Sequence, residues 1–113
     1  MSAVYVSNLI INTGATFSQS FDLLNSDSSG PLDLNGFTVA SQFRKHAGSS
    51  TKTDFTTAIT DASNGQISIS LSSTQTAAIS KPGRYVYDVE INSGTVKTRV
   101  IEGSVLVREG VTK

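Results

Sequence analysis

The sequence predicts an all-β fold, an antiparallel β-sandwich of about seven strands with one short helix. Three observations support this fold class. Apolar and polar residues alternate along several short runs, which is typical of strands with one buried face. Clusters of Gly, Asn, Asp and Ser separate these runs at a spacing of roughly ten residues. The 113 residues suffice for a single domain, residues 1–113, with one modest core.

The N-terminal residues 1–14 predict an irregular strand, because Tyr5 and Leu9 belong to an apolar run that keeps no single phase. The run fits a strand that crosses between two sheets. It also fits an arm that pairs with a neighbouring chain. Residues 15–24 then predict a regular strand whose apolar residues share one face: Phe17, Phe21 and Leu23.

Two polar segments separate the strands that follow. Residues 25–36 are dense in turn-forming residues and predict a surface loop, and residues 45–52 predict a flexible connection. A turn at residues 61–65 separates the last two strands of this part. The residues that share the core-facing phase of the three predicted strands are Phe37, Val39 and Phe43, then Phe55, Thr57 and Ile59, then Ile67, Ile69 and Leu71.

One short helix interrupts the strands. Ser72 and Gln75 fit a capping box, in which the serine hydroxyl and the glutamine side chain each accept a hydrogen bond from the other residue's backbone N–H. Pro82-Gly83 ends the segment. We expect Ile79 to cover one end of the sandwich.

Residues 84–107 predict a long hairpin at the centre of an antiparallel sheet. Asn92-Ser93-Gly94 supplies the turn. The apolar phase of the second strand changes near Gly103, which predicts a bulge at that glycine. The apolar residues that share the core face of the first strand are Tyr85, Tyr87, Val89 and Ile91.

The charge balance excludes some partners. Nine basic and nine acidic residues give a formal net charge of zero. Nucleic acids and anionic membranes both require a basic excess or patch, so we expect neither as a partner. The chain has no cysteine, which excludes disulfides and thiolate metal sites. The N-terminus lacks the basic flank and apolar core of a signal peptide, so we expect synthesis in the cytoplasm without a conventional secretion signal.

Few residues could carry catalysis. His46 is the single histidine and lies in a polar segment, so the sequence predicts neither a Ser-His-Asp arrangement nor a zinc site. Asp88 and Glu90 share one face of a strand. Lys97 and Arg99 on the next strand predict a cross-strand charge ladder there rather than an acid–base pair. We therefore predict no enzymatic activity and no cofactor.

Calcium and stacking sites are not predicted either. Asp61 and Asn64 resemble part of a calcium loop, but a capped turn explains both residues. All aromatic residues except Tyr5 occupy apolar strand faces. One free ring is too little for a platform that stacks on sugars or bases.

Several stretches of the chain carry a resemblance to a known family. They are DLNGFTV at 33–39 with Arg44 soon after, DASNGQI at 61–67, LSSTQTAAI at 71–79, PGRYVYDVE at 82–90, GTV at 94–96 and GSVLV at 103–107. Together they resemble the small immunoglobulin-like domains of tailed-bacteriophage virion proteins, typified by the N-terminal domain of baseplate upper proteins. The resemblance covers most of the chain. It implies an immunoglobulin-like sandwich that anchors a protein to the virion and has no catalytic residues.

Members of that family often continue into a coiled coil or a receptor-binding region, whereas this chain stops at Lys113. The resemblance therefore implies a stand-alone accessory protein located in the virion. Such a protein would dock on other virion proteins, either at the tail, baseplate or neck or as a capsid decoration. We also expect a homo-oligomer or another symmetric assembly in the particle.

If docking is the function, the contact residues should lie outside the core pattern. An alternative function is a carbohydrate-binding module that helps a virion adhere to its host, although exposed aromatic residues for it are scarce. A small enzyme is a third possibility, but it lacks a nucleophile or base site. The contact residues expected in the N-terminal run and the two polar loops are Tyr5, Leu9, Asp27, Asp33, Lys45, His46 and Lys52.

Overall fold

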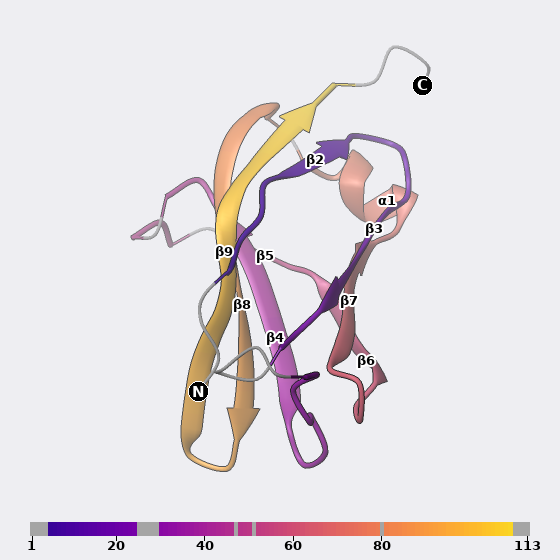
Figure 1. Cartoon of the computed structure of the whole chain (residues 1–113). Helices are drawn as coiled ribbons and strands as arrows, with labels where there is room; N and C mark the ends of the chain where they lie inside the picture. Colours follow the sequence, from indigo (N-terminus) through magenta and orange to yellow (C-terminus); the bar gives the residue numbers. More distant parts are fainter. Residues whose placement is uncertain (1–4, 25–29, 47, 51, 80, 110–113) are drawn as a thin grey trace.

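The computed structural model describes residues 5–24, 30–46, 48–50, 52–79 and 81–109. The strands of this described part form two sheets packed as a sandwich, which confirms the predicted fold class (Figure 1). In chain order the elements are β1 (Tyr5–Val6), β2 (Leu9–Asn12), β3 (Phe17–Asp22), β4 (Thr38–Arg44), β5 (Lys52–Asp54), β6 (Thr56–Asp61), β7 (Gln66–Leu71), α1 (Ser73–Ala77), β8 (Gly83–Ser93) and β9 (Val96–Arg108).

The larger sheet has the strand order β1-β9-β8-β4-β5, with β2 also paired to β9, and the smaller sheet has the order β3-β7-β6. In immunoglobulin nomenclature, β9-β8-β4-β5 correspond to strands G, F, C and C′, and β3-β7-β6 correspond to B, E and D. The long β8–β9 hairpin lies in the middle of the larger sheet, as the sequence predicts (Figure 1).

The N-terminal run forms two short strands, β1 and β2, that pair parallel with β9 of the same chain. Both strands therefore belong to the larger sheet, and the predicted crossing of this run between two sheets is wrong. Leu9 is 4% exposed and packs in the core.

A close backbone approach fixes the connection between β1 and β2. A Cβ atom on Gly103 of β9 would overlap the Ser7 carbonyl oxygen, so a larger residue would push the connecting segment away. Two hydrogen bonds hold the segment in place. The Tyr87 hydroxyl donates to the Ser7 carbonyl at 2.5 Å, and Asn8 Oδ1 accepts from the Ser104 N–H at 3.0 Å.

The β8–β9 pair contains a bulge, but its predicted position at Gly103 is wrong. The register of the pair shifts between Val89 and Glu90, so Val100 is the extra residue. Val100 and Ile101 are consecutive and both are fully buried. The bulge thus turns two neighbouring apolar side chains toward the core, which explains the change of phase seen in the sequence.

The single strand predicted around Phe55 is two strands in the structure, because the chain passes from one sheet to the other at this residue. β5 pairs with β4 in the larger sheet, whereas β6 pairs with β7 in the smaller one. Phe55 lies between them with 5% of its surface exposed, and its amide donates to the Ser41 carbonyl at 3.0 Å. This change of sheet, together with the division of the N-terminal run, explains why the described strands outnumber the predicted seven or so.

Aromatic side chains connect the two sheets across the core. The ring centroid of Phe55 lies 5.8 Å from that of Phe17, 5.2 Å from Phe43 and 6.2 Å from Tyr87. Tilted and edge-on contacts at these separations are favourable for aromatic pairs. The prediction that these aromatic residues pack in the core is confirmed.

The predicted surface loop at residues 25–36 also supplies a core residue, Leu34, which is 1% exposed. The turn between β6 and β7 supports this segment. The Leu34 amide donates to the Ala62 carbonyl at 2.8 Å, and the Leu23 amide donates to the Gly65 carbonyl at 2.9 Å. The turn-forming residues around Leu34 concealed this core position in the sequence.

The helix α1 begins at the predicted cap. Ser72 Oγ accepts a hydrogen bond from the Gln75 amide at 3.1 Å, and Gln75 Oε1 accepts one from the Ser72 amide at 2.8 Å. The predicted capping box is therefore confirmed.

A buried threonine, which the sequence analysis missed, ties α1 to the turn between β2 and β3 (Figure 1). Thr76 is fully buried, and its hydroxyl accepts from the Gly14 N–H at 3.0 Å and donates to the Ala15 carbonyl at 2.8 Å. Ile79 is partly buried against the core, as expected. Thr76 and Ile79 together close this end of the sandwich.

Candidate interaction surface

The face of the larger sheet that points away from the core, here called the outer face, carries exposed apolar side chains. Among the described residues, four large hydrophobic side chains are exposed by 40% or more, and all four lie on strands of the larger sheet. Ile10 and Val86 adjoin buried residues along their strands and so point outward, and Val6 pairs with Glu102, which lies on the same outward side. The four are Val6, Ile10 and Val86, which point outward, and Val96 at the tip of the β8–β9 hairpin.

Three apolar side chains on neighbouring strands are arranged diagonally across the outer face. Ile10 on β2 pairs with Leu106 on β9, and Leu106 pairs with Arg84 on β8. Val86 is the next outward residue along β8. Ile10, Leu106 and Val86 are called the apolar strip below. Exposed apolar side chains bordered by polar ones are a recognised mark of protein contact surfaces.

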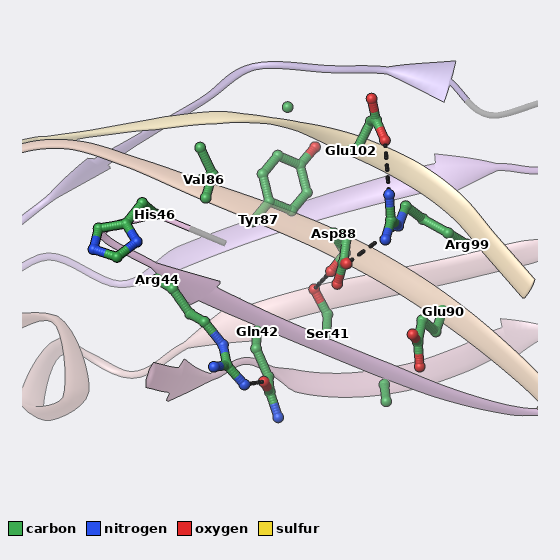
Figure 2. Close-up of a pocket in the computed structure, with 12 residues that line it drawn as sticks. Ser41, Gln42, Arg44, His46, Val86, Tyr87, Asp88, Glu90, Arg99 and Glu102 are labelled. Carbon is green, nitrogen blue, oxygen red and sulfur yellow. Dashed lines mark hydrogen bonds and ion pairs between the residues drawn. The ribbon is translucent and has the colours of Figure 1, made fainter. Parts of the chain in front are cut away.

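A hollow of about 730 Å³ opens on the outer face beside the apolar strip (Figure 2). Val86 and charged side chains from β4, β8 and β9 line it. Arg99 Nε lies 3.3 Å from Asp88 Oδ2, and Arg99 Nη1 lies 3.4 Å from Glu102 Oε1. The contact with Asp88 confirms the predicted cross-strand charge pairing for Arg99, whereas Glu102 lies on the same strand as Arg99. Because the three side chains are well exposed, the ion pairs add little to stability.

The aromatic residue in the wall of the hollow is not accessible. Tyr87 is 4% exposed, and its hydroxyl donates to the Ser7 carbonyl. Burial raises the pKa of this hydroxyl above the ordinary value for tyrosine. The hollow therefore offers no exposed ring on which a sugar could stack.

Sites of other kinds do not emerge from the described residues. In that part of the chain, no three His, Cys, Asp or Glu side chains lie close enough together to hold a metal ion. Its one helix is too short to cross a membrane. Asn64 Nδ2 donates to Asp61 Oδ2 at 2.8 Å, which agrees with a capped turn at these residues.

The contact residues predicted from the sequence are distributed over several parts of the domain. Tyr5 lies in β1 opposite Ile101, at one edge of the larger sheet. Leu9 lies in the core, so the prediction that its side chain contacts a partner is corrected. Asp27 lies outside the described residues. Asp33 is exposed, and its Oδ1 accepts hydrogen bonds from the backbone and side chain of Asn35 at 3.0 and 2.7 Å, as in a turn.

The three basic candidates lie near one another at one end of β4 and β5. Lys45 and His46 follow the last residue of β4, and Lys52 pairs with that residue across the two strands. Lys45 Nζ donates to the Arg84 carbonyl at 3.0 Å and lies 5.0 Å from the Tyr85 ring centroid. His46 lines the hollow (Figure 2).

Sequence reasoning missed the apolar strip, although one signal was present. Val86 stands in phase with Asp88, Glu90 and Asn92 on the polar face of a strand. If the alternate residues of this strand face the core, an apolar residue at position 86 must be exposed. Ile10 could not be assigned, because the N-terminal run keeps no phase.

Comparison with known proteins identifies the family. The family model described as "LtfC-like, beta-sandwich domain" matches residues 4–108. No curated protein matches the chain significantly. Among solved structures, the crystal structure of Listeria monocytogenes InlP is similar, with a TM-score of 0.52 and 17% identity. The match covers 90% of this chain but only 26% of the InlP chain, and at this identity it shows the fold alone. Because the family model spans nearly the whole chain, the protein belongs to the LtfC-like β-sandwich domain family.

Proposed function

We propose that this protein is a non-enzymatic structural domain of a bacteriophage particle and that it works through protein–protein contacts made by its outer face. The observation that carries the proposal is the apolar strip. Ile10 is 53% exposed and Val86 is 40% exposed, on a sheet face that also carries charged side chains. Burying such side chains against another protein is favourable by roughly 25 cal/mol per Å² of apolar surface.

The composition of the outer face supports a protein partner. Apolar side chains at the centre of a patch and charged side chains around it are the usual anatomy of a protein interface. The charged residues are about half exposed and can pair with groups on a partner. A sugar would require exposed aromatic rings, which the hollow does not offer.

The family to which the chain belongs supports a place for this protein in a bacteriophage particle. LtfC, after which the family is named, is a phage-related protein. The turn and core motifs quoted above resemble virion domains that act by attachment. We include in the proposal that this role requires no cofactor. The position within the particle, at the tail, baseplate or neck or on the capsid, is the open part of the proposal.

The test is incorporation of variants into phage particles. Val86→Glu places a charge in the apolar strip, whereas Val96→Glu places the same charge on another exposed valine, 57% exposed at the hairpin tip. Tagged versions of both variants and of the unchanged protein are supplied during infection, and particles are purified and quantified. We expect Val86→Glu to lower incorporation about tenfold, equivalent to about 1.4 kcal/mol, while Val96→Glu incorporates normally. Normal incorporation of both variants would exclude the outer face as the docking surface.

A further inference from the structure

The strand β3 at one edge of the smaller sheet differs from the other edge strands of the described chain (Figure 1). Among the described strands it pairs with β7 alone, over six consecutive residues without a register shift. β6, at the opposite edge of the same sheet, contains a register shift, and β5, β1 and β2 have only three, two and four residues. Short strands, bulges, lysine and proline are the usual protections of a sheet edge. β3 has none of them, so its free edge is suited to pair with a further strand.

The ladder between β3 and β7 determines which backbone groups face this free edge. The Leu23 amide donates to the Gly65 carbonyl at 2.9 Å, which extends the ladder by one pair. Because the bonding direction alternates along an antiparallel strand, every second residue of β3 turns its N–H and C=O away from β7. Gln19 Nε2 donates to one of these carbonyls at 3.0 Å. The residues whose backbone groups face the free edge are Ser18, Ser20 and Asp22.

The sequence of this edge reads the same in both directions. Residues 17–21 are FSQSF, with Gln19 at the centre. Phe17 and Phe21 are partly buried against the core, whereas Gln19, which lies in phase between them, is exposed. Two such segments that run antiparallel and are centred on Gln19 place serine opposite serine and phenylalanine opposite phenylalanine.

We propose that the free edge of β3 pairs with the same edge of a second copy of this chain, antiparallel and about a two-fold axis through Gln19. Such an axis is perpendicular to the sheet and makes the interface self-complementary. The two smaller sheets then join into one continuous sheet, as in other cases of strand addition at an exposed edge.

The backbone groups fit this pairing. Ser18 of one copy exchanges two hydrogen bonds with Ser20 of the other, and the symmetry repeats this exchange on the far side of the axis. Asp22 faces Thr16 of the second copy, so the pairing sets no two like charges opposite each other.

The side chains select the register. With the axis through Gln19, Phe17 faces Phe21 of the second copy in a non-hydrogen-bonded pair, in which opposing side chains lie closest. Aromatic pairs across strands are favourable. An axis shifted by one residue to Ser20 would instead place Gln19 opposite Phe21, so the palindrome favours the axis at Gln19.

This dimer goes beyond the proposed function, because the edge of β3 is separate from the outer face of the larger sheet. The two-fold axis leaves both outer faces on the same side of the dimer. Each copy therefore still presents its apolar strip to another protein.

Cysteine cross-linking tests both the pairing and its register. The chain has no cysteine, so a single introduced cysteine forms a disulfide only with another copy. In the Gln19→Cys variant the two Cα atoms on the axis would lie about 4.5 Å apart, within the range for a disulfide. Ser20→Cys, at the next exposed residue of β3, is the matched control. Its two Cα atoms would lie about 8–9 Å apart, beyond that range.

We expect Gln19→Cys to cross-link at least about tenfold faster than Ser20→Cys under mild oxidation. Equal rates for the two variants would overturn the inference.

Sedimentation velocity measures the dimer without a cross-link, on the unchanged protein from about 10 µM to about 1 mM. Gln19→Lys and Gln19→Glu each set two like charges opposite each other on the axis, so each variant alone should dissociate about fivefold more readily. An equimolar mixture of the two variants should form a one-to-one complex, because lysine then faces glutamate. Gln66→Lys, an exposed substitution on the central strand of the same sheet, is the control and should dimerise as the unchanged protein does.

A protein that stays monomeric at the highest concentration would overturn the inference. A dimer that Gln19→Lys leaves unchanged would also overturn it, because that dimer would lie at another surface. These variants leave Ile10 and Val86 unaltered, so the dimer and the docking of the outer face can fail independently. Loss of the dimer with normal sensitivity of incorporation to Val86→Glu would leave the proposed function standing.

Discussion

Replacing Gly65 by alanine should destabilise the domain far more than the same change at Gly94. Both glycines have positive φ, +66° at Gly65 and +59° at Gly94, and both occupy turns between paired strands. Their surroundings differ. A Cβ atom at Gly65 would lie 2.5 Å from the Leu23 carbonyl oxygen and 2.7 Å from the Leu32 carbonyl oxygen, whereas nothing lies within 4 Å of one at Gly94.

The two substitutions therefore separate two costs. Alanine in the left-handed conformation costs about 1 kcal/mol at either position. At Gly65 the backbone that carries the Leu23 and Leu32 carbonyls must also move. We expect this movement to add about 2 kcal/mol, as overpacking does in other cores. The total of about 3 kcal/mol at Gly65 is a large part of the stability of a small domain, which is about 5–15 kcal/mol.

Urea unfolding followed by circular dichroism measures the difference. With a slope of about 1.5 kcal/mol per molar urea, the midpoint should fall by about 2 M for Gly65→Ala and by about 0.7 M for Gly94→Ala. Equal shifts for the two variants would refute the close packing of the β6–β7 turn against the segment that contains Leu23 and Leu32.

Three further predictions concern the core and its polar contacts. Thr76→Val removes two hydrogen bonds between α1 and the β2–β3 turn and should cost about 1–2 kcal/mol in urea unfolding, whereas Thr76→Ser should retain most of this energy; equal losses would contradict the role of the hydroxyl. Because burial raises the pKa of the Tyr87 hydroxyl, the folded protein holds this proton more tightly than the unfolded chain, so stability should be complete below pH 10 and fall as pH rises above about 10. Tyr87→Phe should remove that part of the pH dependence, and an unchanged profile would show that another group causes it. Val89→Asp would bury an unpaired charge at a position with no exposed surface and should abolish folding, so a soluble, folded variant would contradict the core assignment.

Much of the fold was predictable because each regular strand buries one face. The alternation of Ile67, Ile69 and Leu71 matches a strand in which all three residues are buried. The capping box at Ser72 was equally readable, since it depends on two residues three positions apart. Such features are set by neighbours in the sequence, so the sequence alone is sufficient to predict them.

The errors concern features that depend on distant parts of the chain. The phase change in β9 suggested a bulge at Gly103, because glycine often marks one. The extra residue is Val100, and the glycine instead makes room for the backbone of Ser7. Phe55 was placed inside one strand because its phase fits, although the chain changes sheets there. The position of the bulge and the change of sheet both depend on tertiary contacts, which a local sequence pattern does not reveal.

The outer face was the least predictable part. Contact residues were predicted in the N-terminal run and in two loops, whereas the apolar strip extends over β2, β9 and β8. Exposure of Val86 depends on the absence of a further layer over the larger sheet among the described residues, and the pairing of Ile10 with Leu106 depends on the parallel register of β2. The charges at Lys52 and Asp54 were visible in the sequence, but their position on the outer face requires the register of β4 and β5.

The central claim, a structural role in a phage particle, is tested most directly by the number of copies of this chain in purified virions, relative to the major capsid protein. Quantitative mass spectrometry of the particles gives this ratio. We predict a fixed, reproducible copy number. Hundreds of copies would indicate capsid decoration, and roughly a few dozen or fewer, in multiples set by ring symmetry, would indicate the neck, tail or baseplate. Absence of the chain from purified particles would contradict the proposed function.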